Sequence, residues 1–111
     1  MITVSFTEST MLIECAGHPS ELCGGLQDVL PKTLDSGSRR IVVDLSNVPY
    51  LSEAFYPDVS AFCKKLEEAG CWVGCVLRWS TGYWEQALHM SRFAEVFPSR
   101  EDALAAAESN T

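Results

Sequence analysis

The 111-residue sequence predicts a single α/β domain, residues 1–111, with a mixed sheet of four to five strands and about four helices. Three observations lead to this fold class. Apolar residues alternate near the N-terminus, as in a half-buried strand. Two near-continuous apolar runs, Arg40–Leu45 and Trp72–Arg78, are typical of strands covered on both faces. Segments with helical periodicity separate the runs, and this order predicts parallel β-α-β crossovers.

The first two strands are expected to form a hairpin. In the first strand, 1–6, the side chains of Ile2, Val4 and Phe6 share one side, which predicts that this side is half-buried. A polar turn then leads to a second strand over Met11–Ala16.

A helix is expected after the break at residues 17–20. It has one apolar face, formed by Leu22, Leu26, Val29 and Leu30. Pro31 should kink or end this helix, because proline lacks the amide hydrogen and crowds the preceding turn. Residues 34–38 are then expected to form a loop.

The second helix is expected over Pro57–Ala69, with Gly70 as its C-terminal stop. Its apolar stripe consists of Phe55, Val59, Phe62 and Leu66, with Cys63 beside it.

Three further elements are expected towards the C-terminus. A short helix covers 81–91, and 93–97 forms a short edge strand. Ser99, followed three residues later by Asp102, is typical of the capped start of a last helix.

Composition and charge exclude several classes of function. The net charge of −7 and the pI near 4.6 disfavour nucleic acid as a partner, because an acidic surface repels phosphates. No apolar run approaches the roughly 20 residues of a membrane helix, and the start does not resemble a signal peptide. We therefore expect a soluble, cytoplasmic protein without direct membrane insertion.

The cysteines and histidines do not predict a catalytic or metal centre. On one strand Cys71 and Cys75 would lie about 13 Å apart, too far for a disulfide or a shared metal. The five cysteines are expected to be reduced, and Cys15 and Cys63 to be buried as small hydrophobes. His18 and His89 are expected at the surface or in caps. A Cys15–His89 catalytic pair has no supporting signature, so we expect no enzyme, no metal and no cofactor.

The segment Ile41–Phe55 (Ile-Val-Val-Asp-Leu-Ser-Asn-Val-Pro-Tyr-Leu-Ser-Glu-Ala-Phe) resembles the signature of STAS domains of the anti-sigma-factor-antagonist type. In that family a buried strand ends in Asp-Leu-Ser-x-Val, and an Asp-Ser-Ser-Gly or Asp-Ser-Thr-Gly element then opens a helix. Residues 68–73 and 93–105 also resemble the family's later junctions. The resemblance covers most of residues 40–108 and implies a STAS-like fold.

This sequence departs from the family at the phosphorylated motif. Ser52 falls on the aspartate, Glu53 on the first hydroxyl residue, and Ala54 on the phosphorylated serine or threonine. Ser52 could be a displaced acceptor only if the loop is rebuilt. Pro57 argues for such a rebuilt loop, because it would be the fifth residue of a helix capped by Ser52. We therefore expect an irregular turn over 52–56 and a regular helix from near Pro57.

The resemblance implies a non-catalytic regulatory module of a bacterial partner-switching pathway. Its expected partner is a protein such as an anti-sigma-factor-like serine kinase, and a homodimer is left open. The switch by phosphorylation is expected to be absent, with Glu53 either a fixed negative charge at the vacant site or simply a solvated acid at a helix start. The expected partner-binding residues are Ser46, Asn47, Ser52, Glu53, Ala54, Tyr56 and Trp79.

Two other functions remain open from the sequence. The chain could be an accessory STAS subunit of a membrane transport system, which needs no phosphate acceptor. It could also be a small-molecule binder of similar α/β shape.

Overall fold

The computed structural model describes residues 1–7, 9–77 and 92–109. Its strands are β1 (Ile2–Thr7), β2 (Thr10–Ala16), β3 (Arg40–Asn47), β4 (Trp72–Val76) and β5 (Glu95–Phe97). Its helices in the described residues are α1 (Pro19–Leu22), α2 (Gly25–Asp35), α3 (Phe55–Glu68) and α5 (Arg100–Ser109).

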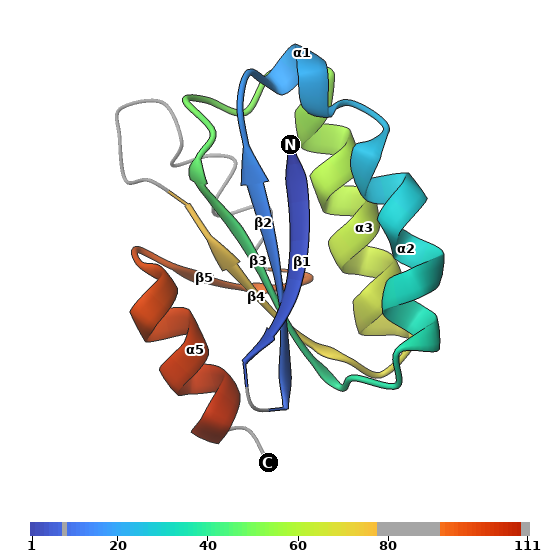
Figure 1. Ribbon diagram of the computed structural model, residues 1–111, viewed down its shortest axis with the longest axis vertical. Coiled ribbons are helices and arrows are strands. Elements are labelled where there is room, and N and C mark those ends of the chain that lie inside the picture. The colour runs from blue at the N-terminus through green and yellow to red at the C-terminus, as the bar shows by residue number, and fades with distance from the viewer. Residues whose placement is uncertain (8, 78–91, 110–111) are drawn as a thin grey trace.

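The strands form one mixed five-stranded sheet in the order β1-β2-β3-β4-β5. β1 and β2 are antiparallel, while β2, β3, β4 and β5 run parallel to their neighbours. Helices α1, α2 and α3 lie on one side of the sheet and α5 on the other (Figure 1). The predicted hairpin, parallel crossovers and fold class are therefore confirmed.

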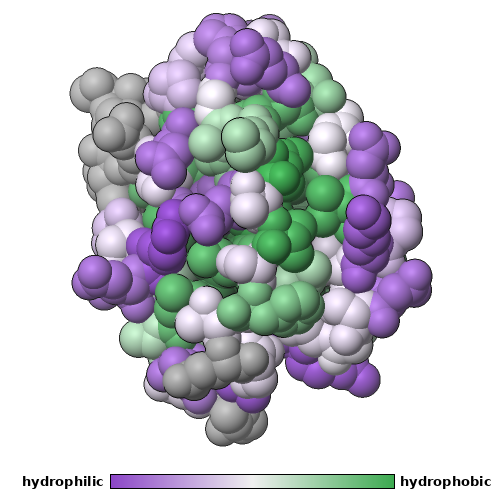
Figure 2. All heavy atoms as spheres, viewed as in Figure 1, coloured by the Kyte–Doolittle hydropathy of each residue, from purple (hydrophilic) through white to green (hydrophobic). Residues whose placement is uncertain are grey.

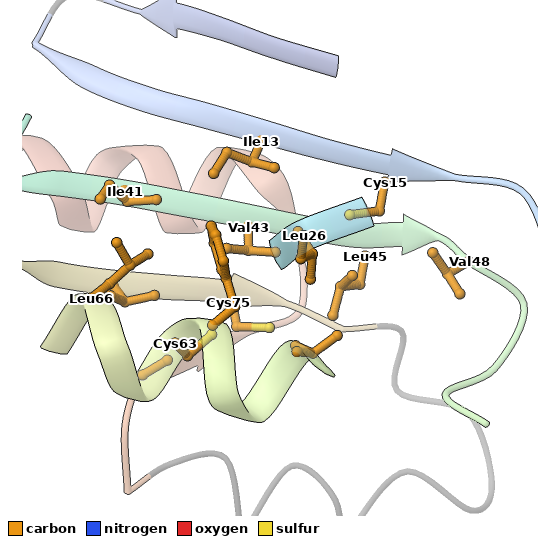
Figure 3. Close-up of a cluster of buried hydrophobic side chains, with 14 of the residues drawn as sticks. Ile13, Cys15, Leu26, Ile41, Val43, Leu45, Val48, Cys63, Leu66 and Cys75 are labelled. Atoms are coloured by element: carbon orange, nitrogen blue, oxygen red, sulfur yellow. The ribbon is translucent and has the colours of Figure 1, made fainter. Parts of the chain in front are cut away.

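The main core lies between the sheet and helices α1–α3. Figure 3 shows side chains of β2, β3 and β4 meeting those of α3. The predicted stripe of α3 is fully buried, as are Cys15, Cys63 and Cys75. A smaller core lies under α5 and consists of Leu12, Val42, Val76, Ala103 and Ala107. Small alanines on α5 allow this helix to pack closely on the sheet.

The prediction that one side of β1 is half-buried is wrong for two of its three residues. Ile2 packs against the main core, but Val4 is 38% and Phe6 60% exposed. In the described sheet β1 is an edge strand, and α2 approaches it at Ile2, whose Cδ1 lies 2.6 Å from where a Cβ on Gly25 would be. The absence of a side chain at Gly25 permits this close approach.

The first predicted helix is divided in two, and Pro31 does not end it. The break falls at Gly24, whose φ of 83° favours glycine. The Gly24 amide donates to Asp58 Oδ2 at 3.0 Å. α2 continues through Pro31 to Asp35, because Leu26, Leu30 and Thr33 on both sides of the proline are buried. Tertiary packing of the apolar face outweighs the local cost of proline.

The irregular turn predicted over 52–56 is also wrong, and α3 starts two residues before the predicted start near Pro57. α3 begins at Phe55, and the Ser52 carbonyl already accepts a helical bond from the Tyr56 amide at 2.9 Å. Pro57 is the third residue of α3, and proline is tolerated in the first turn of a helix. Its missing N–H therefore costs little there.

The C-terminal predictions are confirmed where the structure describes them. β5 is a short edge strand parallel to β4. Ser99 Oγ accepts from the Asp102 amide at 3.2 Å, as expected for the cap of the last helix. The helix predicted over 81–91 lies outside the described residues. Among the residues that are described, no helix combines the length and apolarity needed to cross a membrane.

We predict that Pro31→Ala stabilises the protein by about 2 kcal/mol. The alanine restores a helical hydrogen bond and removes the penalty of about 3 kcal/mol for proline inside a helix. The greater conformational freedom of the unfolded alanine variant offsets about 1 kcal/mol of this gain. Pro19→Ala is the control, because Pro19 stands at the first position of α1, where proline is favourable. Urea denaturation measures both variants, and a lower midpoint for Pro31→Ala than for the parent would contradict the prediction.

Candidate functional site

The end of β3 is shaped by the buried carboxylate of Asp44. Its Oδ1 accepts hydrogen bonds from the Ser46 amide at 2.9 Å and from the Ser46 hydroxyl at 2.6 Å. Its Oδ2 accepts from Arg100 Nε of α5 at 2.7 Å. The Asp44 side chain is 1% exposed, so these partners replace the water that an ionised carboxylate needs.

A second carboxylate completes this ion network. Arg100 Nη2 contacts Glu14 Oε2 of β2 at 2.8 Å, so one guanidinium joins β2, β3 and α5. Burial raises the pKa of Asp44, but the hydrogen bonds from Ser46 and the charge and hydrogen bond of Arg100 outweigh it. The pKa of Asp44 is therefore lowered, and the carboxylate is ionised at neutral pH.

Two predicted site residues, Ser46 and Asn47, follow directly at this point. Ser46 is half-buried, and its hydroxyl is committed to Asp44. Asn47 is exposed, and its carbonyl accepts from the Gly17 amide at 3.5 Å, which ties the ends of β2 and β3 together. Asn47 is thus presented to solvent, whereas Ser46 supports the turn from inside.

The loop after β3 is anchored by apolar residues and leads into a capped helix. Val48 and Leu51 are buried, and the Val48 amide donates to the Leu45 carbonyl at 3.1 Å. Ser52 Oγ then accepts from the Phe55 amide at 3.0 Å, the bond of a serine cap at a helix start.

Glu53 and Ala54 follow Ser52 and are both exposed. Their position at the start of α3 favours an acidic side chain, because helix N-termini carry a partial positive charge. The capping oxygen of Ser52 lies in a half-buried side chain directly before them. The structure therefore brings Ser52, Glu53 and Ala54 together in one turn, in which Glu53 and Ala54 are exposed and Ser52 is half-buried.

The pair Tyr50–His18 belongs to the same region, although the sequence interpretation did not include it in the site. Tyr50 is 45% exposed, and its hydroxyl lies 3.1 Å from His18 Nε2. The two rings meet edge to face with centroids 5.6 Å apart. His18 also caps α1, since its Nδ1 accepts from the Ser20 amide, which confirms the expectation of a surface or capping histidine.

The exposed residues His18, Asn47, Tyr50, Glu53 and Ala54 together form what we call the carboxyl-edge surface. The name reflects its position, since β2 and β3 are parallel and both end there (Figure 1). Crevices and binding surfaces of open α/β sheets lie at this edge.

Another predicted site residue, Tyr56, does not join this surface. Tyr56 is half-buried and packs against the main core, and desolvation raises the pKa of its hydroxyl despite the opposing charge of Arg92. Trp79 lies outside the described residues.

The thiols of the core are poor nucleophiles. Burial raises the pKa of Cys15 and of Cys63 to about 12, and raises that of Cys75 well above its ordinary value. A thiol must lose its proton to attack or to bind a metal. Within residues 1–7, 9–77 and 92–109, no three His, Cys, Asp or Glu side chains are grouped so that they could hold a metal ion.

A shallow hollow lies at the opposite end of the sheet. Its volume is about 240 Å³, and its lining comes from the end of α2 and from the turns that precede β3 and β4: Leu34, Gly37, Ser38, Arg39, Ala69 and Cys71. Pockets for small molecules usually have volumes of about 300–1,000 Å³. This hollow is therefore small for a ligand site and is far along the strands from the carboxyl-edge surface.

Comparison with solved structures identifies the fold. An anti-sigma factor antagonist from Mycobacterium paratuberculosis superposes with a TM-score of 0.80 at 19% identity, covering 97% of this chain and 93% of that one. The chain has the fold of the anti-sigma factor antagonists. The antagonist SpoIIAA in its unphosphorylated form matches with a TM-score of 0.71 at 9% identity, with 100% of both chains covered.

A third similar structure with the antagonist fold carries a substitution. It is a serine-to-glutamate variant of RsbS from Moorella thermoacetica, with a TM-score of 0.76 at 10% identity over 97% of this chain and 95% of that one. No protein-family model and no curated protein matches the sequence. The STAS-like fold expected from residues 40–108 is thus confirmed by structure, at sequence identities between 9% and 19%.

We predict that Arg100→Met lowers the stability of this antagonist fold by about 1–3 kcal/mol at neutral pH, because it leaves the Asp44 carboxylate buried with Ser46 alone. The loss should shrink in acid. Since the folded-state pKa of Asp44 is below its ordinary value of 3.8, its stabilising effect is present above that value and disappears as the pH falls through the folded-state pKa. Denaturation midpoints from pH 7 down to the acid transition provide the test.

Lys65→Met is the matched control, since it removes a positive charge from an exposed position of α3. It should change stability by less than about 0.5 kcal/mol. A deficit of Arg100→Met that is equal at all pH values would show that the carboxylate of Asp44 is not the group that Arg100 stabilises.

Proposed function

We propose that this chain is a non-catalytic regulatory module that binds a protein through its carboxyl-edge surface, in the manner of an anti-sigma factor antagonist. The partner is an anti-sigma-factor-like serine kinase, and docking is not switched by phosphorylation. The observation that carries the proposal is the Ser52–Ala54 turn, which opens α3 in a chain of the antagonist fold and exposes the carboxylate of Glu53 and the methyl group of Ala54.

The carboxyl-edge surface has the chemistry of a protein-docking site. Tyr50 presents a large aromatic ring held at its hydroxyl by His18, so that little side-chain freedom is lost on binding. Tyrosine is among the residues that dominate binding energy at interfaces. Glu53 adds a single charge beside it, which can select a partner of positive potential.

The geometry of Ser52 supports a docking function without a switch. The Ser52 oxygen caps the Phe55 amide, and the side chain is half-buried, so a kinase would have to break the cap to reach it. Ala54 is exposed but has no hydroxyl. Glu53 supplies a permanent negative charge at the turn, although it is weaker than the charge of about −2 that a phosphate adds.

We predict that the immobilised chain retains a serine-kinase-like protein from a lysate of its source organism, and that Tyr50→Ala and Glu53→Lys reduce the amount retained about tenfold or more. Glu101→Lys is the control, with the same change of charge at an exposed position of α5. Mass spectrometry of the retained protein is the measurement.

Three outcomes would count against this docking function. Equal retention by all variants would move the docking site elsewhere, and retention of a transport subunit alone would replace the kinase partner. A metabolite released on denaturation, without any retained protein, would favour a small-molecule binder.

We predict that Ala54→Ser acquires one phosphate when it is incubated with the retained kinase and ATP, whereas the parent chain acquires none. The variant restores a hydroxyl at the position where the STAS resemblance puts the phosphate acceptor. Because residue 54 is exposed, a kinase can reach this hydroxyl. Intact mass with peptide mapping is the readout, and Ala105→Ser, exposed on α5, is the matched control. A phosphate on Ser52 of the parent chain would contradict the proposed loss of the switch.

A further inference from the structure

The outer edge of β1 carries backbone groups that point away from the sheet. Among the described residues β1 pairs with β2 alone. Met1 and Ala16 exchange both backbone bonds, at 2.6 and 2.9 Å. Bonded pairs alternate along an antiparallel ladder, so Thr3, Ser5 and Thr7 also bond to β2. The backbone N–H and C=O groups of Ile2, Val4 and Phe6 therefore point outward.

This edge lacks the features by which edge strands usually avoid pairing. Residues 1–7 contain no charged side chain and no proline, although the chain has a net charge of −7. The register with β2 runs without a bulge from Ile2 to Thr7. Lysine, proline and bulges are the common means of protecting an edge. β1 is thus an uncharged, regular edge on an acidic protein.

The side chains next to this edge are apolar and exposed. Val4 and Phe6 lie on the face that packs against α2, where they are 38% and 60% exposed. Figure 2 shows hydrophobic residues gathered in the middle of this view, with hydrophilic residues around them. An apolar patch bordered by polar residues is typical of an interaction surface.

We propose that β1 pairs antiparallel with β1 of a second copy of this chain, about a twofold axis at Val4. In this register Val4 lies opposite the second copy's Val4, and Ile2 lies opposite the second copy's Phe6. The three pairs of outward-facing residues then exchange about six hydrogen bonds, two for each pair. The result is one continuous sheet across two copies.

The composition of β1 favours a second copy over a peptide of another kind. A twofold axis places apolar residues opposite apolar residues on one face, and Thr3 opposite the second copy's Ser5 on the other. Such uncharged pairs let two chains of charge −7 approach each other at this strand, where like charges would otherwise oppose pairing. A charged peptide would find no complementary side-chain charge between Ile2 and Thr7.

The axis runs perpendicular to the sheet, so the α2 faces of both copies lie on the same side. Val4 and Phe6 of the two copies then form one continuous apolar row, which pairing would remove from water. No residue of the carboxyl-edge surface takes part in this pairing, so the inference stands independently of the docking function.

Sedimentation velocity of Val4→Lys and of the parent chain tests the proposal. The parent should be a dimer in the micromolar range, and Val4→Lys should raise the dissociation constant more than about tenfold, since two lysines would face each other at the axis. Ala105→Lys, with the same change of charge on exposed α5, should stay dimeric. A monomeric parent, or a Val4→Lys variant that dimerises as well as the parent, would overturn the proposal.

Cross-linking tests the register, and it does so even if Val4→Lys loses its fold. In a Cys23→Ser background, which removes the exposed cysteine, Val4→Cys should form an intermolecular disulfide under mild oxidation. The two Cα atoms would lie about 5.5 Å apart, within the range of disulfides. Two Thr7→Cys residues would lie about 20 Å apart and should not cross-link. Equal cross-linking of both variants, or of neither, would overturn the register.

Discussion

The carboxylate of Asp44 lies inside the protein at the end of β3, where an unpaired charge would cost several kcal/mol. Ser46 occupies one of its oxygens and Arg100 the other. The same group therefore fixes the turn that leaves β3 and the attachment of α5 on the opposite face. Because Arg100 also reaches Glu14, β2 is held to this network. The exposed carboxyl-edge surface depends on it for its position.

Around this fixed point the polar atoms that support the turn are distinct from the side chains that remain exposed. Ser46 and Ser52 use their polar atoms inside the structure, the first on Asp44 and the second on the start of α3. Tyr50 and Glu53, between and beside them, remain exposed. A rigid turn with exposed side chains is compatible with the proposed protein binding, because few groups would have to be ordered on association. The uncharged edge of β1 is a second surface, different in chemistry from the first.

The candidate site could be predicted only in part, because several of its contacts join residues that are far apart in the sequence. The turn 52–54 could be predicted because its residues are neighbours in the sequence and align with the phosphorylated motif of STAS domains. The pair His18–Tyr50 and the bond from Arg100 to Asp44 join residues 32 and 56 positions apart, which no local pattern indicates. The expected irregular turn before Pro57 failed for a different reason. The prediction placed Pro57 in the interior of the helix, where proline is costly, whereas Pro57 lies in the first turn of α3.

The sequence by itself determined the order of the strands, the buried stripe of α3, the buried strands β3 and β4, and the absence of a hydroxyl at Ala54. These follow from periodicity, propensity and residue identity, which act over a few neighbouring positions. Only the tertiary structure decided that α2 continues through Pro31, that Val4 and Phe6 are exposed, and that Asp44 is paired with Arg100. Each of these depends on which element lies against which, and that is fixed by the packing of the whole core rather than by any one segment.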